Sequence, residues 1–167
     1  MSTLSVIPET QTSNPLDLVE HIITSNSWPF ERSDENEINI SIGGSWVDYH
    51  MSFTWRSELG VLQLTCAFDL KVPQPKRSEI NNLLAMINEQ LWLGHFDLWP
   101  DEGVLLYRHG HLLRGGSLAT MEECETLVSV AIDSCERYYP AFQFVLWGGK
   151  SAKEAIAATM LECVGEA

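Results

Sequence analysis

The stretch VDYHMSFTW, residues 47–55, alternates apolar and polar side chains without a break. In an extended chain, one face of this stretch carries only apolar side chains, those of Val47, Tyr49, Met51, Phe53 and Trp55. Strict alternation of this kind predicts a β-strand that is buried on one side and wet on the other. An antiparallel sheet with one covered face is therefore the expected scaffold.

The segments on either side of this strand show the same period of two. The preceding segment places Ile38, Ile40 and Ile42 on one face. The following segment alternates Leu62, Leu64, Cys66 and Phe68 with smaller or polar residues. Short turns join antiparallel strands, so the three segments predict a three-strand antiparallel meander.

Helical periodicity flanks the meander. Asn14 and Pro15 provide a cap and a first-turn proline for a helix whose apolar face carries Leu16, Val19, Ile22 and Ile23. A second apolar stripe at helical spacing comprises Ile80, Leu83, Leu84, Ile87 and Leu91. This second helix is expected to stop at Gly94.

The rest of the chain, from His95 onward, predicts two strands and further helices. The strands are expected from Phe96 to Trp99 and from Val104 to His109. Capping boxes at Thr120–Glu123 and Ser151–Glu154 open two helices, the first of which Pro140 is expected to kink or restart. The run from Ala141 to Trp147 fits both periods, and helix is favoured. The fold class is therefore α+β, with the order helix, three-strand meander, helix, two strands and C-terminal helices.

Composition limits the classes of function. Residues 1–13 form a polar lead-in, and residues 14–167 are expected to form a single domain. The chain has 10 Lys and Arg against 23 Asp and Glu, a balance that disfavours nucleic acid and anionic membranes as partners. With no signal-like N-terminus and no CxxC pair among its cysteines, the protein is expected to be cytoplasmic, with Cys66, Cys124 and Cys135 reduced and buried.

Two segments invite a nucleotide-binding or a catalytic interpretation. The sequence GGKS, residues 148–151, resembles part of a phosphate-binding loop, but Phe144 occupies the position where that loop needs its first glycine. A glycine C-cap followed by a helix explains it better. Polar residues around the turn after Phe96, namely His95, Asp97, Asp101 and Glu102, match no catalytic motif. No catalytic residue, cofactor or metal is predicted.

The basic residues Arg108, His109, His111 and Arg114 lie close together in an otherwise acidic chain. They form a candidate anion site. His109 and His111 would share a face of a strand, but no third metal ligand accompanies them at a recognisable spacing. A solvated strand end is the alternative explanation.

Three apolar residues are candidates for a partner-binding surface. Trp46 is expected on the mostly polar face of the strand that contains Tyr49 and Phe53. Met86 and Leu93 lie off the main apolar stripe of the second helix. Burial against neighbouring elements is the alternative for Met86 and Leu93.

Several longer motifs run through most of the chain. They are GHFDLWPDEG (94–103), YRHG (107–110), RGG (114–116), ERYYPAFQFVLWGGKSAKEA (136–155) and the terminal GEA, together with WPFER (28–32), GSWVDYHMSFTW (44–55) and CAFDLKVP (66–73). In these motifs the chain resembles the YbjN family of putative bacterial sensory transduction regulators. The family is similar in fold to type III secretion chaperones, which implies binding of partner polypeptide segments, with a homodimer as one candidate assembly.

The favoured hypothesis is thus a non-enzymatic protein-binding module with a regulatory or chaperone-like role in a bacterial cell. Its partner is expected to be a protein or peptide segment. The alternative hypothesis is a small-molecule or anion sensor that uses the Arg108 to Arg114 cluster. An enzyme built around His95 to Glu102 is a third alternative, with the least support from the sequence.

Overall fold

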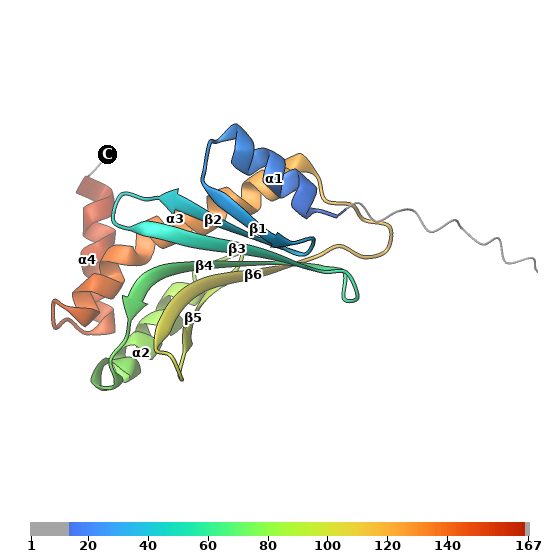
Figure 1. Cartoon of the computed structure of the whole chain (residues 1–167). Coiled ribbons are helices and arrows are strands. Elements are labelled where there is room, and N and C mark those ends of the chain that lie inside the picture. Colours follow the sequence, from blue (N-terminus) through green and yellow to red (C-terminus); the bar gives the residue numbers. More distant parts are fainter. Residues whose placement is uncertain (1–13, 166–167) are drawn as a thin grey trace, which may run out of the picture.

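A computed structural model describes residues 14–165, and side chains as far as Leu161 (Figure 1). The lead-in predicted for residues 1–13 lies outside this range. The helices are α1 (Leu16–Ser25), α2 (Arg77–Asn88), α3 (Met121–Leu146) and α4 (Ala152–Gly165), and a 3-10 turn, η1, spans Gln74–Lys76. The strands are β1 (Phe30–Asp34), β2 (Glu37–Gly43), β3 (Asp48–Arg56), β4 (Val61–Lys71), β5 (His95–Trp99) and β6 (Val104–Leu112).

The strands form one antiparallel sheet in the order β1-β2-β3-β4-β6-β5. The register aligns apolar side chains across the central strands, for example Met51 opposite Cys66 and Phe53 opposite Leu64. Cys66 in turn lies opposite Tyr107 of β6. The period-two pattern read from the sequence therefore gives a continuous apolar face that runs across the sheet.

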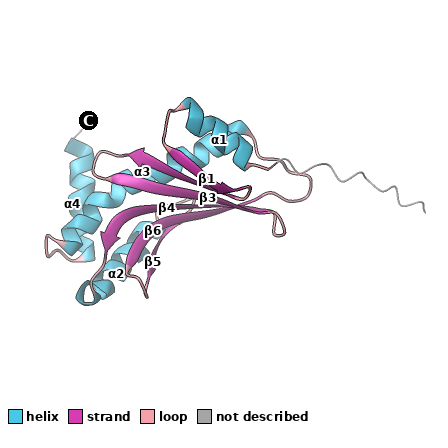
Figure 2. Cartoon of the chain, viewed as in Figure 1, coloured by secondary structure: helices cyan, strands magenta, loops and turns pink. Residues whose placement is uncertain are grey.

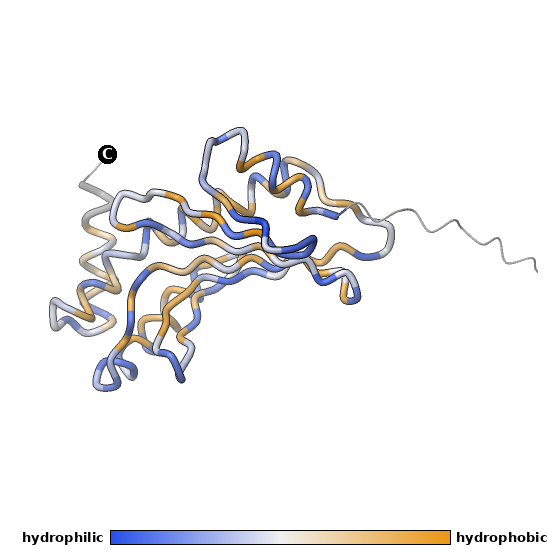
Figure 3. Tube along the Cα trace, in the orientation of Figure 1, coloured by the Kyte–Doolittle hydropathy of each residue, from blue (hydrophilic) through white to orange (hydrophobic). Residues whose placement is uncertain are grey.

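Helices α1, α2 and α3 cover this apolar face, and α4 packs against α2 and α3 (Figures 1 and 2). The long α3 crosses behind the sheet and contacts both β4 and β6. Buried side chains of the sheet and of all four helices belong to a single core. The opposite face of the sheet carries mostly polar side chains, and Figure 3 shows the alternating hydropathy along the strands.

The α+β class and the order of elements are confirmed, with one strand added. The sequence reading missed β1, which turns the expected three-strand meander into four consecutive strands. Its sequence FERSD has no alternation, because it is an edge strand that the helices cover only in part. On the helix side of β1, Arg32 pairs with Asp17 and Glu20 of α1, so an ion pair takes the place of the apolar contact that the other strands make.

Helices α3 and α4 begin at the capping boxes predicted for them, whereas α2 ends earlier than expected and Pro140 does not interrupt α3. Helix α2 ends at Asn88, six residues before Gly94, and α3 runs without interruption through Pro140 to Leu146. Both hydrogen bonds of the capping box between Thr120 and Glu123 are present. The helical reading of the segment after Ala141 is thus correct.

Cys66, Cys124 and Cys135 are free and buried, as the apolar positions in their elements predicted. Burial raises the pKa of the Cys124 thiol to about 11. A hydrogen bond with Cys66 and burial raise the pKa of Cys135 as well. All three thiols are buried, and the raised pKa values of Cys124 and Cys135 also suppress the reactive thiolate, so maleimide should modify them in the native protein far more slowly than in the denatured protein. Peptide mass spectrometry after a short labelling pulse measures this, and equal rates in both states would contradict their burial.

We expect Phe53→Ala to lower the free energy of unfolding by about 3 to 5 kcal/mol. The Phe53 ring is completely buried between β3 and the helices, so its removal loses transfer free energy and leaves a cavity. Urea denaturation measures the change. His50→Ala, on the opposite and exposed face of the same strand, is the control and should move the midpoint little.

Candidate functional site: the Leu93 hollow

The loop between α2 and β5, residues 89–94, presents two apolar side chains to solvent. Trp92 is 99% exposed and Leu93 is 39% exposed. A tryptophan that keeps nearly all of its surface in water contributes almost nothing to the folded core. Its position therefore calls for an explanation outside the packing of the domain.

This loop is fixed at both ends by hydrogen bonds. The Asn88 side chain accepts from the Phe96 backbone N–H at 2.8 Å and donates to the Phe96 carbonyl at 3.0 Å. Closer to its tip, the Tyr107 hydroxyl donates to the Leu93 carbonyl at 2.8 Å. The loop conformation, and with it the exposure of Trp92, is held in place by the sheet.

Gly94 allows the Tyr107 hydroxyl to reach the Leu93 carbonyl. It adopts a φ of +69°, and a Cβ at this position would overlap the Tyr107 ring. Only glycine accepts both conditions at low cost. Burial raises the pKa of Tyr107 to about 12, so its hydroxyl stays protonated as a donor to Leu93.

Beside this loop lies a cavity of about 420 Å³, which we call the Leu93 hollow. It lies between β6 and the first turns of α3, and Leu127 provides a second apolar side chain on its wall. Its other lining residues are Leu93, His109, His111, Thr120, Glu122, Glu123 and Thr126. The structure thus brings Leu93 together with both histidines of the predicted anion cluster, although it lies in a loop and not on the second helix as expected.

The charges around the hollow come from the start of α3. Glu123 closes the capping box, since its Oε2 accepts from the Thr120 N–H at 3.0 Å. The same oxygen lies 3.7 Å from Nε2 of His111. Glu122 adds a second carboxylate on the rim. An apolar wall with an acidic rim suits an apolar side chain flanked by a cationic group.

His109 has a pKa below its ordinary value. Partial burial is the main cause, because it disfavours the charged ring, and the neighbouring His111 and His95 act in the same direction. His109 is therefore mostly neutral at physiological pH. Within residues 14–165, no group of three or more potential ligands is placed to hold a metal ion.

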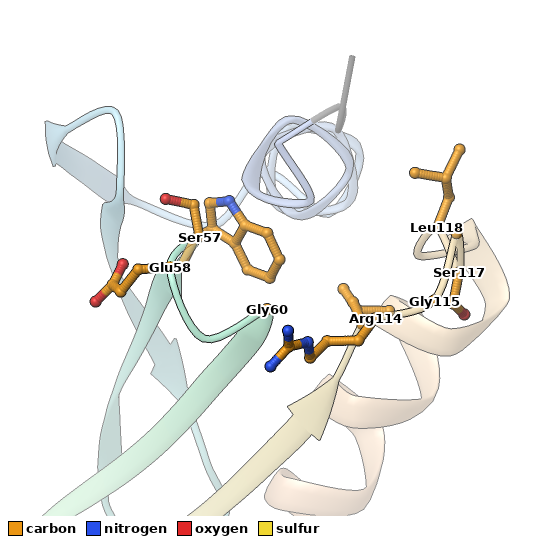
Figure 4. A pocket seen from close by; sticks show the side chains of 10 residues that line it. Ser57, Glu58, Gly60, Arg114, Gly115, Ser117 and Leu118 are labelled. Atoms are coloured by element: carbon orange, nitrogen blue, oxygen red, sulfur yellow. The ribbon is translucent and has the colours of Figure 1, made fainter. Parts of the chain in front are cut away.

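The four residues of the predicted anion cluster do not assemble into one site. Neighbouring residues of a strand point to opposite faces, so Arg108 lies on the polar face while His109 lies on the helix side. Arg108 pairs there with Asp97 at 3.3 Å. Arg114 follows the end of β6 and reaches past Gly60 into a different cavity (Figure 4).

Trp46 does not lie on the strand where it was predicted. It belongs to the loop between β2 and β3, on the helix side, and its Nε1–H donates to the Glu136 carbonyl of α3 at 3.2 Å. That carbonyl is the one that Pro140, lacking an N–H, leaves without its helical donor. Trp46 thus donates to the backbone carbonyl that the proline leaves without a donor. Its role as a partner anchor stays a prediction, but the argument for it, a position on the polar face of the strand, no longer applies.

Met86 and the GGKS segment do not lie at a candidate site. Met86 is partly buried and packs against the core, which is the alternative considered for it above. GGKS connects α3 to α4, so a helix precedes it instead of the strand that a phosphate loop requires. The sequence reading overlooked Trp92 because the second helix was expected to continue to Gly94. The pair Trp92-Leu93, placed directly before a glycine, was the available signal.

Comparisons with known proteins agree with the family resemblance. A family model described as "Putative bacterial sensory transduction regulator", YbjN, matches residues 15–144. The chain belongs to the YbjN family. No curated protein sequence matches it. None of the helices described between residues 14 and 165 is long and apolar enough to cross a membrane.

Two solved structures share the YbjN fold of this chain. One is YbjN from E. coli, titled a putative transcription regulator, with 10% identity, a TM-score of 0.53, and coverage of 72% of this chain and 85% of that one. The other is the ExsC-ExsE complex, with 16% identity, a TM-score of 0.50, and coverage of 77% and 92%. These likenesses support the expected type III secretion chaperone-like fold.

We expect the stability of this YbjN-family protein to fall as the pH drops below about 6.5, partly through His109. Its pKa is lowered in the folded state, so the unfolded state binds more protons below the ordinary value of 6.5. Stability is thus full above that pH and is lost on acidification. His109→Gln should reduce the change in urea midpoint between roughly pH 7.5 and pH 5.5, whereas the exposed His50→Gln should not. Equal changes in both variants would contradict this.

A double-mutant cycle tests the pairing of Trp46 with the carbonyl freed by Pro140. Trp46→Phe should cost about 1 kcal/mol in the free energy of unfolding, because the carbonyl loses its donor. In a Pro140→Ala background, the alanine N–H can bond that carbonyl, so the cost of Trp46→Phe should shrink. Additive effects of the two changes would mean that the cost of Trp46→Phe does not come from the carbonyl that Pro140 frees.

Proposed function

We propose that this chain is a protein-binding regulatory module that receives a segment of a partner polypeptide at the Leu93 hollow. The observation that carries this proposal is the exposure of Trp92 on a loop that hydrogen bonds hold rigid. Rigid, exposed aromatic side chains are the preferred anchors of protein interfaces, because little conformational entropy is lost when a partner covers them.

The chemistry of the hollow specifies the partner segment. An apolar side chain of the partner would lie between Leu93 and Leu127, and a lysine or arginine beside it would meet Glu122 and Glu123. The net charge of the chain, −13, attracts basic segments over a longer range. We therefore infer that the partner segment is basic and carries one or more apolar anchors.

The family and the structural neighbours favour binding over catalysis. The family description names a regulator, and one structural neighbour is itself a complex between two proteins. No pair of nucleophile and base was found in the hollow, whose polar groups are two histidines, two threonines and two glutamates. The second hypothesis, an anion sensor built on Arg108 to Arg114, requires these side chains to lie close together, and they do not.

Site-specific photo-crosslinking tests the proposal in the full-length chain. Benzoylphenylalanine at position 92 should crosslink a partner in a bacterial lysate, while the same group at position 147 should not. Trp147 is a matched control because it is also an exposed tryptophan, 68% accessible, beyond the far end of α3. Crosslinking with equal yield at both positions, or at neither, would count against the Leu93 hollow.

Charge reversal tests the predicted chemistry of the partner. Glu122→Lys should weaken capture of the crosslinked partner by about tenfold, since a favourable charge contact becomes a repulsive one. Glu31→Lys makes the same change in net charge on β1 and should have a much smaller effect. If both variants weaken capture equally, only the overall charge matters and the hollow is not the site.

A further inference from the structure

A second cavity, of about 250 Å³, lies at the turn between β3 and β4, next to the segment that follows β6 (Figure 4). In Figure 4, Ser57 and Glu58 lie on one side of Gly60, and Arg114 lies on the other. Ser117 and Leu118 line the cavity from the Arg114 side. It is separate from the Leu93 hollow and shares no lining residue with it.

Arg114 differs from the other arginines in its lack of a partner. Three of them form ion pairs with carboxylates, namely Arg32, Arg56 and Arg108. Arg77 donates to the carbonyls of Val72 and Pro100, and Arg137 stacks on the Tyr138 ring. Among the side chains that the structure describes, no acceptor or ring is paired with Arg114. In so acidic a protein, a guanidinium left without a carboxylate is available for an external anion.

The stem of this arginine is set by close contact with the β3–β4 turn. Gly60 has a φ of +66°, and a Cβ there would lie 2.5 Å from Cγ of Arg114 and 2.8 Å from the Leu113 carbonyl oxygen. Any side chain at position 60 would therefore displace the arginine. The backbone N–H of Leu113 also donates to the Gly60 carbonyl at 2.6 Å, which ties the two segments together.

The one carboxylate beside this cavity is already paired. Arg56 Nε lies 2.7 Å from Oε1 of Glu58. A bond from its own backbone N–H, together with Arg56, lowers the pKa of Glu58, so it is ionised and compensated. With Arg56 balancing Glu58, the positive charge of Arg114 is left uncompensated at the cavity.

We propose that this cavity, which we call the Arg114 pocket, binds a small organic monocarboxylate with an apolar body. The carboxylate would accept two parallel hydrogen bonds from the planar guanidinium of Arg114. Trp55, Leu113 and Leu118 supply the apolar part of the lining, and Ser57 and Ser117 supply hydroxyl donors near the rim. The cavity is smaller than the usual ligand site, which restricts the ligand to a single ring or a short chain.

A monocarboxylate is favoured over phosphate by charge and by lining. The protein carries a formal charge of −13, so each additional negative charge on a ligand raises the electrostatic cost of its approach. A single unpaired guanidinium neutralises one such charge. Bare phosphate also leaves the apolar walls of Trp55 and Leu118 without a partner.

Calorimetric titration with three probes tests the proposal on the full chain. Phenylacetate should bind with a dissociation constant on the order of 1 mM or lower. Phenylacetamide keeps the ring and lacks the charge, whereas inorganic phosphate keeps a charge and lacks the ring. Both should bind at least about tenfold more weakly, because phenylacetamide cannot form the ion pair with Arg114 and phosphate cannot fill the apolar part of the pocket.

Matched variants locate the binding. Arg114→Gln should weaken phenylacetate binding by about tenfold or more, and Arg137→Gln, an equal charge change on α3, should leave it unchanged. Leu118→Ala should weaken phenylacetate and leave acetate unaffected. Arg114 and Leu118 are exposed, so circular dichroism should show the fold intact in each variant. No binding of phenylacetate, equal binding to Arg114→Gln, or phosphate binding as tightly as phenylacetate would each overturn the proposal.

Discussion

The packing of aromatic rings between the sheet and α3 is the contact on which the rest of the molecule depends. Phe68 of β4 stacks on Phe142 at a centroid distance of 5.6 Å and meets Tyr49, Phe96 and Tyr139 edge to face. These rings come from two central strands, an edge strand and the long helix. Edge-to-face and offset contacts add stability beyond the burial of area. The cluster thereby fixes α3 across the sheet, and α3 in turn carries one wall of the Leu93 hollow.

Local patterns in the sequence were sufficient to predict the covered sheet. The alternation around Phe53 and the capping box at Thr120 each determine a local conformation whose physical cause lies within a few residues. What they could not supply is a position that depends on a distant partner. The β1 strand is one such case, since its helix-facing Arg32 is satisfied by carboxylates from α1. Trp46 is another, because its loop position depends on a carbonyl that Pro140 frees in α3.

The candidate sites show that residues close in sequence need not lie together in the structure. Proximity in sequence suggested that Arg108, His109, His111 and Arg114 act together, yet alternation along β6 places the first two on opposite faces. That separation could have been foreseen from the strand prediction itself. The isolation of Arg114 could not, because it depends on the close approach of Gly60 from another turn. The exposure of Trp92 likewise depends on clasps from Asn88 and Tyr107, which lie outside the loop.

The two candidate sites are joined by a single short segment of chain. Strand β6 supplies His111 to the Leu93 hollow and ends at Leu112, two residues before Arg114 in the other cavity. The same segment continues through Leu118 to Thr120, whose side chain caps α3 and also lines the hollow. The three residues from His111 to Arg114 span only about 10 Å when extended, so a displacement of Arg114 would also shift the backbone at His111. A ligand in one cavity would influence binding at the other only through a difference in its affinity for two arrangements of this segment. The chain therefore provides a physical route between the two sites, and the size of any coupling is limited by how far residues 113–120 can move without losing the α3 cap.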